Sequence, residues 1–559
     1  MRSTPTPPSS ITGARDEAQA LISPRTSTFS IDGATSGDGA AAAAQPADVL
    51  ASSSFGPLLP DPALSWVGEV RLTARLAGPL VLQDALVFSA STILVIVVGR
   101  TSPPDLAPLV LAASLFNVCG LAVVVGIASA LETLLSQAYG YGAHADLGRL
   151  LQRALVVEGV LVSIVAVLWA RADLVLRLLG EPAALADSAA VFVRLASPGL
   201  AAIAAAECMR RWLVAQHAVI LPPVASGIQA AVCGLVAWAL VGKAGMGLRG
   251  AAAAVCISAA TAAATLALGS LAHHRARVRG GAKPTWVPWS TSALRGLWGY
   301  LRVAIPSAAL VVMEWVALEF LVLASGWVKP HPETAVSVSG VFFQTMTLVY
   351  AIPLGVSAAA STRVGRELGA GRPKAAARAA HVAVAGTACA GVAVGLAVGA
   401  GSGAWARLFS SDPAVLALAA RVAPWVSVAV VGDAINGASA GVIRGAGRQG
   451  TAAGLAAVSY WLIGLPAAAG LAFGRWHLGV VGLWAGLACS SALQAVAMGT
   501  LVARLDWAAE SRKARARVAE SCERGEGEVG EDVAGLTPAA PPLFSPGVLS
   551  PLPPAGAAL

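Results

Sequence analysis

Charged side chains are scarce in this chain of 559 residues: 12% are Asp, Glu, Lys or Arg, whereas 56% are hydrophobic. Soluble globular proteins carry about 25% charged residues, because polar groups must cover their surface. Half that density excludes a large soluble protein and indicates a chain that lies in a lipid bilayer. The net charge of +8 comes from cations in short loops and tails, not from a basic stripe interleaved with aromatic residues. No nucleic-acid partner is therefore expected.

Sequence motifs of common enzyme and metal sites are missing as well. The chain has no G-x-x-x-x-G-K-[ST] loop for nucleotide phosphates and no HExxH zinc motif. Its seven cysteines form no CxxC pair, and six of them lie inside apolar runs, as small buried hydrophobic residues do. The sequence predicts a protein that is not an enzyme and that holds no metal or other cofactor.

Twelve apolar runs are long enough to cross a membrane as helices, since about 20 helical residues span ~30 Å of hydrocarbon. Many runs are rich in Ala and Gly, which lets membrane helices approach one another closely. The predicted fold class is therefore an all-α polytopic membrane protein with twelve transmembrane helices. The approximate centres of the runs are Ala90, Gly120, Val160, Ala201, Ala230, Ala260, Val312, Met346, Ala390, Val428, Ala456 and Leu487.

Five segments are expected along the chain. Residues 1–70 are rich in Ser, Thr, Pro and Ala and predict a disordered N-terminal tail. Helices 1–6 occupy residues 71–272, and helices 7–12 occupy residues 301–506. The loop at 273–300, which contains the basic stretch HHRARVRGGAK, is expected to lie in the cytoplasm between two lobes. The charged and then Pro-rich end, 507–559, is expected to be a second disordered tail.

The lysines and arginines between the runs predict the orientation of the chain. Seventeen lie in loops on the same side as the two tails, and ten lie in loops on the other side. Because cytoplasmic loops carry the excess of Lys and Arg, both termini are expected in the cytoplasm.

One element of the sequence occurs twice. Residues 126–142 read GIASALETLLSQAYGYG, and residues 355–371 read GVSAAASTRVGRELGAG, at a constant offset of 229 positions. Each stretch covers the predicted cytoplasmic end of the second helix of its half, so two pseudo-symmetric lobes of six helices share one orientation. Gly140 and Gly369 are expected to be the left-handed residues that end these helices.

Three carboxylates lie near the middle of predicted membrane helices: Asp84, Glu314 and Asp433. Charged residues in the bilayer are costly, and they mark functional sites by default. Removal from water favours the protonated form of a carboxyl group, so such a group can exchange a proton, as a proton-coupled antiporter requires. Asn436 is expected on the same helical face as Asp433. The alternative is a structural acid that is hydrogen-bonded to a neighbouring helix, an alternative that is strongest for Asp84.

Four further polar residues are candidates for a gate or a cavity lining. Glu132 and Arg363 lie at the cytoplasmic ends of the two repeated helices, and we expect Glu132 to meet a basic residue of the other half, Arg363 being the first choice. The alternative is that both charges reach out to the lipid headgroups. Glu207 is expected to pair with the nearby Arg210 and Arg211. Asn117 and Asn436 are the only asparagines of the chain, and both lie in membrane helices.

Four stretches resemble signature sequences of plant-type multidrug and toxic compound extrusion (MATE) transporters. The resemblance covers roughly residues 75–505, with the stretches in matching order and spacing. They read LETLLSQAYGYG, RRWLVAQHAVILPP, STRVGRELGAGRP and GVIRGAGRQ.

This resemblance implies two six-helix lobes and export of a small organic solute by alternating access in exchange for an ion. It also implies that Glu314 and Asp433 form the proton site of the second lobe. Prokaryotic relatives use an aspartate late in the first helix, which here would fall near Ser91 and Thr92. Asp84 lies about two turns earlier and does not match that position, so it does not inherit the role.

The function predicted from the sequence is proton-coupled efflux of organic cations, drugs or secondary metabolites by a monomer in the vacuolar or plasma membrane. No cofactor is expected beyond the proton gradient, and sodium coupling is the less favoured option. Two alternatives remain: a citrate-like organic-anion exporter of the same fold, and a non-transporting flippase or scaffold relative.

Overall fold

The computed structural model describes residues 65–178, 180, 182–289, 294–407 and 412–534. Every regular element in this part of the chain is helical. Twelve helical spans are long and apolar enough to cross a membrane, and each contains one of the twelve centres predicted from the sequence. The all-α polytopic fold class is confirmed.

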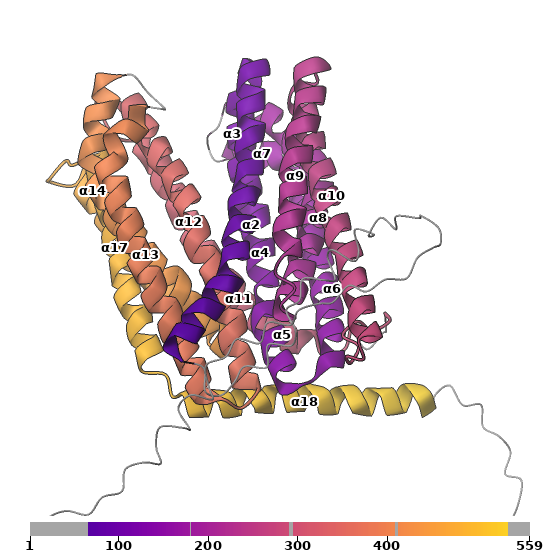
Figure 1. Ribbon diagram of the computed structural model, residues 1–559. Helices are drawn as coiled ribbons and strands as arrows, with labels where there is room; N and C mark the ends of the chain where they lie inside the picture. The colour runs from indigo at the N-terminus through magenta and orange to yellow at the C-terminus, as the bar shows by residue number, and fades with distance from the viewer. Residues whose placement is uncertain (1–64, 179, 181, 290–293, 408–411, 535–559) are drawn as a thin grey trace, which may run out of the picture. The chain divides into compact units, whose positions relative to one another are not determined.

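The first six spans, drawn from indigo to magenta in Figure 1, come from the N-terminal half. In a bilayer each span must satisfy its own backbone polar groups, which a helix does. The helices are α2 (Trp66–Thr101), α3 (Leu106–Phe116), α4 (Ala122–Ala128), α5 (Ala130–Tyr141), α6 (His144–Trp169), α7 (Ala172–Leu178), α8 (Ala183–Ala215), α9 (Leu221–Ala237) and α10 (Gly247–Arg279). Helices α3 to α5 form one span with the π-helical turn η2 (Asn117–Leu121), and the turn η3 (Trp238–Lys243) extends α9. The short helix α7 joins α6 to α8.

The other six spans, drawn from magenta to yellow, come from the C-terminal half (Figure 1). They are α11 (Leu297–Ser325), α12 (Pro332–Gly369), α13 (Pro373–Arg407), α14 (Pro413–Ala446), the broken span of α15 (Gln449–Ala456), η5 (Ala457–Gly464) and α16 (Leu465–Phe473), and α17 (Val480–Ala503). A further helix, α18 (Trp507–Ala534), follows the last span.

Helix α18 differs from the expectation of a disordered tail from residue 507. The stretch is too polar to span a membrane, but it places small and apolar residues such as Ala514 and Val518 on one buried face. Packing of that face against the bundle accounts for the helix. The expected tails at 1–64 and 535–559 lie outside the described residues.

Three predicted segment boundaries also move, because helices continue into segments that were expected to be loop or tail. Helix α2 begins at Trp66, before residue 71, and the loop predicted at 273–300 is shortened at both ends by α10 and α11.

The buried apolar residues form clusters within and between the halves. One cluster contains only residues of α2 to α10, and a second contains residues of α11 to α18. A third combines α4, α5, α6 and α8 of the first half with α11 and α18 of the second. We call the end of the bundle that holds Tyr141, Gly369 and Ala446 the α18 end, because α18 packs there (Figure 1). The two halves therefore meet most closely at this end.

Candidate functional site

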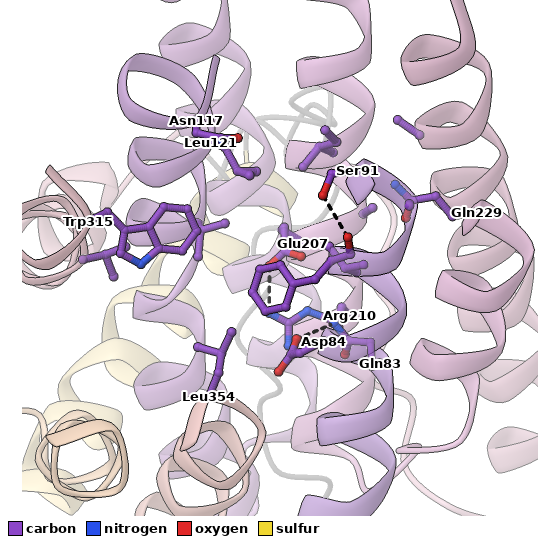
Figure 2. A pocket seen from close by; sticks show the side chains of 18 of the residues that line it. Gln83, Asp84, Ser91, Asn117, Leu121, Glu207, Arg210, Gln229, Trp315 and Leu354 are labelled. Carbon is purple, nitrogen blue, oxygen red and sulfur yellow. Dashed lines mark hydrogen bonds and ion pairs between the residues drawn. The ribbon is translucent and has the colours of Figure 1, made fainter. Parts of the chain in front are cut away.

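A cavity of about 270 Å³ lies between the two halves of the bundle. Its walls come from α2, α3, α8, α9 and α10 on one side and from α11, α12 and α14 on the other. Most lining side chains are apolar or aromatic, among them Phe88, Phe116 and Trp315. Figure 2 shows Trp315 on one side of the cavity and Asp84, Glu207 and Arg210 on the other.

The wall from the first half carries paired charges and one carboxylate that forms no ion pair in the described residues. Arg210 Nη2 lies 2.7 Å from Glu207 Oε2, and Arg211 also pairs with Glu207. The pairing expected for Glu207 is thus present. Asp84 is 7% exposed and accepts a hydrogen bond from Gln83 Nε2 at 3.2 Å (Figure 2).

The wall from the second half contributes Glu314 of α11. Its Oε1 accepts a hydrogen bond from Gln494 Nε2 of α17 at 2.9 Å, and Tyr350 of α12 also hydrogen-bonds to it. Glu314 and Tyr350 both line the cavity. Helices α11, α12 and α17 together hold this carboxyl group at the cavity wall.

Asp433 and Asn436 of α14 lie deeper in the second half. Asp433 borders a separate cavity of about 20 Å³, room for about one water molecule, which Tyr350 also lines. Ser491 Oγ of α17 donates a hydrogen bond to Asp433 Oδ1 at 2.5 Å, and Tyr460 OH lies 3.4 Å from the same oxygen. Asn436 Nδ2 donates to the carbonyl oxygen of Ser491 at 3.1 Å. The common partner Ser491 agrees with the shared helical face expected for Asp433 and Asn436.

Glu132 forms the expected contact with the other half, but not through Arg363. Its carboxylate lies 3.2 Å from Arg444 Nε of α14 and 3.4 Å from Arg211 Nε of its own half. Two positions in the repeat register separate Glu132 from Arg363, which is about 200° around a helix. The two side chains therefore face different neighbours, and the pairing of Glu132 with Arg363 is wrong.

Arg363 forms its own ion pairs across the halves. Its Nε and Nη2 lie 2.9 and 3.0 Å from the two carboxylate oxygens of Glu69 of α2, and its Nη1 binds Glu367. Arg363 is 2% exposed and Glu69 is 1% exposed, so this pair is fully enclosed.

Polar side chains of α5 also bind the C-terminal carbonyl groups of α14. Thr133 Oγ1 donates to the carbonyl oxygen of Arg444 at 2.6 Å, and Gln137 Nε2 donates to that of Gly445 at 2.9 Å. The last carbonyl groups of a helix have no partner within it. Two signature stretches therefore meet: side chains of LETLLSQAYGYG cap the end of α14, which GVIRGAGRQ forms.

The two copies of the repeated element cross each other at glycines. A Cβ atom on Gly140 would lie 2.8 Å from the carbonyl carbon of Arg366, and one on Gly369 would lie 2.9 Å from that of Gln137. Gln137 and Arg366 occupy equivalent positions of the repeat, so the contact is reciprocal, as across a two-fold axis.

The expectation that Gly140 and Gly369 are the left-handed caps is wrong. The residues with positive φ are Gly142 (φ 94°) and Gly371 (φ 76°), two positions later in each copy. The earlier glycines instead let the backbones of α5 and α12 touch.

The remaining candidate and several unpredicted residues complete the site. Asn117 begins the π-helical turn η2 and lines the cavity, and such turns are frequent at functional sites. Sequence reasoning missed Tyr350 and Gln494, whose signal is a polar side chain within an apolar helix. Glu158 of α6 is another buried carboxylate that the sequence did not single out, 1% exposed, but it does not line the described cavities.

Three kinds of comparison relate the chain to known proteins. The sequence profile of the MatE family matches residues 79–239 and 306–469. Protein DETOXIFICATION 14 of Arabidopsis thaliana is 35% identical over 459 residues, covering 81% of this chain and 92% of that protein. Protein DETOXIFICATION 16 of the same plant is 33% identical over 457 residues, with the same coverage of both chains.

Solved structures agree with these matches. The crystal structure of the eukaryotic MATE transporter AtDTX14 has a TM-score of 0.76 at 33% identity and covers 82% of this chain and 100% of that one. An outward-facing conformation of a multidrug resistance MATE family transporter has a TM-score of 0.70 and covers 79% of this chain and 97% of that one. At 16% identity, the second likeness shows the fold alone.

Proposed function

The chain belongs to the MATE family of membrane transporters, and we propose that it expels amphipathic organic cations in exchange for protons. The observation that carries the proposal is the cavity between the halves, which combines apolar and aromatic walls with the carboxylates Asp84 and Glu314. The chain is a transporter and not an enzyme, and its ligand is a small solute.

The charges around the cavity favour a cationic ligand over an anionic one. Each arginine of the lining is paired with a carboxylate: Arg210 and Arg211 with Glu207, and Arg444 with Glu132. An anion would have to compete with these partners. A cation would instead meet Asp84 and Glu314, whose hydrogen-bond donors within the described residues are neutral, and the face of Trp315 adds cation–π attraction.

The exchange of protons is assigned to Glu314 and Asp433. A ligand cation that arrives from the cytoplasm displaces the proton of Glu314, which leaves to cytoplasmic water. Protons that enter from the opposite side later displace the ligand. Tyr350 supports communication between the two carboxyl groups, since it borders both cavities. Asn436 acts by holding Ser491 against Asp433.

We assign both termini and the α18 end to the cytoplasm, on the excess of Lys and Arg in the loops of that side. The ion pairs Glu132–Arg444 and Glu69–Arg363 join the halves at the α18 end. On this assignment, the state described here is closed toward the cytoplasm. The transporter is proposed to act as a monomer in the vacuolar or plasma membrane, with protons rather than sodium as the coupling ion.

The test is uptake of a fluorescent organic cation into proteoliposomes with an acidic lumen. Wild type accumulates the cation, whereas Glu314→Gln and Asp433→Asn each lower the initial rate by about tenfold or more. Glu319→Gln is the matched control, because it makes the same chemical change on α11 at a residue outside the cavity lining.

Two results would contradict the proposal. If the uptake rate depended neither on the pH gradient nor on the two substitutions, Glu314 and Asp433 would have no role in proton coupling. Gradient-driven movement of an organic anion with no movement of cations would favour the anion-exporter alternative.

A further inference from the structure

Helix α18 has a buried face along its first four turns. Ser511, Ala514 and Val518 are buried at helical spacing, whereas Arg512 and Lys513 between them are exposed. Asp506 starts the helix, because its Oδ1 accepts hydrogen bonds from the backbone N–H groups of the second and third residues at 3.0 Å. The helix is therefore a packed element and not a free appendage.

The first two turns of α18 bind the second half. Glu510 is 1% exposed and accepts hydrogen bonds from Arg448 Nη2 at 2.6 Å and Nε at 3.1 Å. Ser511 Oγ donates to the carbonyl oxygen of Leu368 at 3.0 Å, and Ala514 belongs to the apolar cluster of that half. Only three residues, 504–506, separate α18 from α17.

The next two turns bind the first half. Arg517 Nη1 donates to Gln137 Oε1 of α5 at 2.6 Å, and Cys522 Sγ lies 3.0 Å from Asp146 Oδ2 of α6. Val518 belongs to the apolar cluster that contains α5 and α6 residues. The guanidinium of Arg515 lies 5.8 Å from the ring of Tyr141.

Arg517 lies where the two halves meet. Its partner Gln137 uses its amide nitrogen to bind the carbonyl oxygen of Gly445, so one side chain links α5, α14 and α18. Gly447, just beyond the end of α14, lies directly under the Arg517 guanidinium. Separation of the halves at this end must therefore break the contact of Arg517 with one of them.

We propose that α18 is a strap that closes the cytoplasmic end and takes part in each transport cycle. The strap stays on the second half, to which it is joined by the short connection to α17 and by the ion pair of the buried Glu510 with Arg448. It releases Gln137, Asp146 and Tyr141 of the first half when the cytoplasmic end opens. This inference rests on the proposed alternating-access function.

The test crosslinks the strap to each half in turn. Asp146→Cys places a thiol beside the native Cys522 and ties the strap to the first half when oxidised. Leu368→Cys with Ser511→Cys, at a contact where Ser511 Oγ lies 3.0 Å from the Leu368 carbonyl oxygen, ties it to the second half and is the matched control. Each protein is compared with itself, oxidised and reduced, by uptake of a fluorescent cation into proteoliposomes, and oxidised wild type controls for the other cysteines.

The strap predicts that oxidation of the Asp146→Cys protein lowers the uptake rate about tenfold or more, and that reductant restores it. Oxidation of the control pair leaves the rate within about twofold. Equal uptake rates for oxidised and reduced Asp146→Cys would contradict the proposal that α18 is a strap. Loss of uptake on oxidation of the control pair would contradict it as well. The reduced proteins test the transport function separately, because they must carry substrate whether or not a strap exists.

A second variant pair serves if a cysteine protein does not fold. Arg517→Ala loosens the strap, and Arg512→Ala removes an exposed arginine of the same helix. Labelling of Ser129→Cys, a buried cavity residue, by a maleimide from the cytoplasmic side is expected to speed up several-fold in Arg517→Ala alone. Equal labelling rates in the two variants would contradict the strap.

Discussion

The carboxyl groups assigned to proton exchange are held by neutral donors that come from other helices. Glu314 is bound by Gln494, and Asp433 is bound by Ser491, which Asn436 holds in turn. A hydrogen bond to a charged group contributes about 1.5–3 kcal/mol. Neutral donors can stabilise an ionised carboxylate without supplying a positive charge that would repel a cationic ligand.

The hydrogen bond from Ser491 to Asp433 predicts the effect of Ser491→Ala. Loss of the hydroxyl removes a direct hydrogen bond to the carboxylate, so gradient-driven turnover should fall about tenfold while the KM for the cation stays within about twofold. Ser490→Ala is the control, because the Ser490 hydroxyl binds only carbonyl groups of its own helix in the described structure. Equal losses in the two variants would show that the Asp433 contact does not matter.

His217, in the short connection between α8 and α9, predicts a pH dependence of stability. Burial, together with the nearby Arg366 and Arg363, lowers its pKa to about 3. In the unfolded chain histidine titrates near 6.5. The folded state therefore binds fewer protons, and its stability falls as the pH drops below about 6.5.

Wild type should lose free energy of unfolding between pH 7 and pH 5, and in His217→Asn this loss should be smaller by about 1–2 kcal/mol. Asn is the matched substitute, because His217 has a φ of 64°, which Asn tolerates. Thermal unfolding in detergent at the two pH values measures the effect. An unchanged pH dependence in the variant would contradict the neutral state of His217.

At the scale of elements, α5 and α12 form a reciprocal crossing in which each copy of the repeat uses one glycine. Gly140 touches Arg366 and Gly369 touches Gln137, so neither helix has space for a Cβ atom there. Small residues at such points let membrane helices pack backbone to backbone.

Gly369→Ala should therefore destabilise the protein by about 1–3 kcal/mol, the usual cost of overpacking. Gly386→Ala on α13 is the control, because nothing lies within 4 Å of its Cβ position. That change should be neutral or stabilise by up to about 1 kcal/mol, since Ala favours helix over Gly. Melting temperatures in detergent distinguish the two, and a Gly369→Ala protein as stable as wild type would contradict the close crossing.

At the scale of the whole molecule, two enclosed ion pairs and the capping of α14 by α5 close the α18 end of the bundle. Glu132 with Arg444 and Glu69 with Arg363 each join the first half to the second. Loss of one partner from an isolated buried pair costs about 3–5 kcal/mol, because it leaves the other charge uncompensated. Here the cost is smaller, since Arg363 keeps Glu367 and Glu132 keeps Arg211 as second partners. A loss of about 1.4 kcal/mol is already enough to change the ratio of two states tenfold.

Glu69→Gln should therefore shift the protein toward a cytoplasm-open state. Glu333→Gln is the control, because Glu333 is an exposed acid in the first turn of α12 at the opposite end of that helix. In the Ser129→Cys background, maleimide labelling from the cytoplasmic side should be about tenfold faster for Glu69→Gln. Unchanged labelling would show that the pair does not hold the closed state.

Hydropathy predicted all twelve spans, because the bilayer imposes a length and a composition on every span. Isolation within apolar runs also selected Asp84 and Glu314, which line the cavity, and Asp433, which lines the separate small cavity of the second half. The partners were harder to predict, since they depend on how helices rotate against one another. The pairing of Glu132 with Arg444 rather than Arg363, and the position of Tyr350 in the walls of both cavities, depend on how the helices pack in three dimensions.

The C-terminal helix could not be predicted for a related reason. Its sequence from Trp507 to Ala534 is charged and lacks the apolar content of a span, so it resembles a tail. Its helical structure depends on a narrow face that packs against both halves at the α18 end.

The most direct test of the central claim is to follow the pH inside proteoliposomes with a trapped dye while an organic cation is added outside. Proton-coupled antiport predicts that the lumen becomes more alkaline as cations enter and protons leave. Glu314→Gln and Asp433→Asn should abolish this change, and Glu319→Gln should retain it. Cation entry into wild-type proteoliposomes without any change of lumenal pH, measured with the membrane potential clamped, would contradict proton exchange.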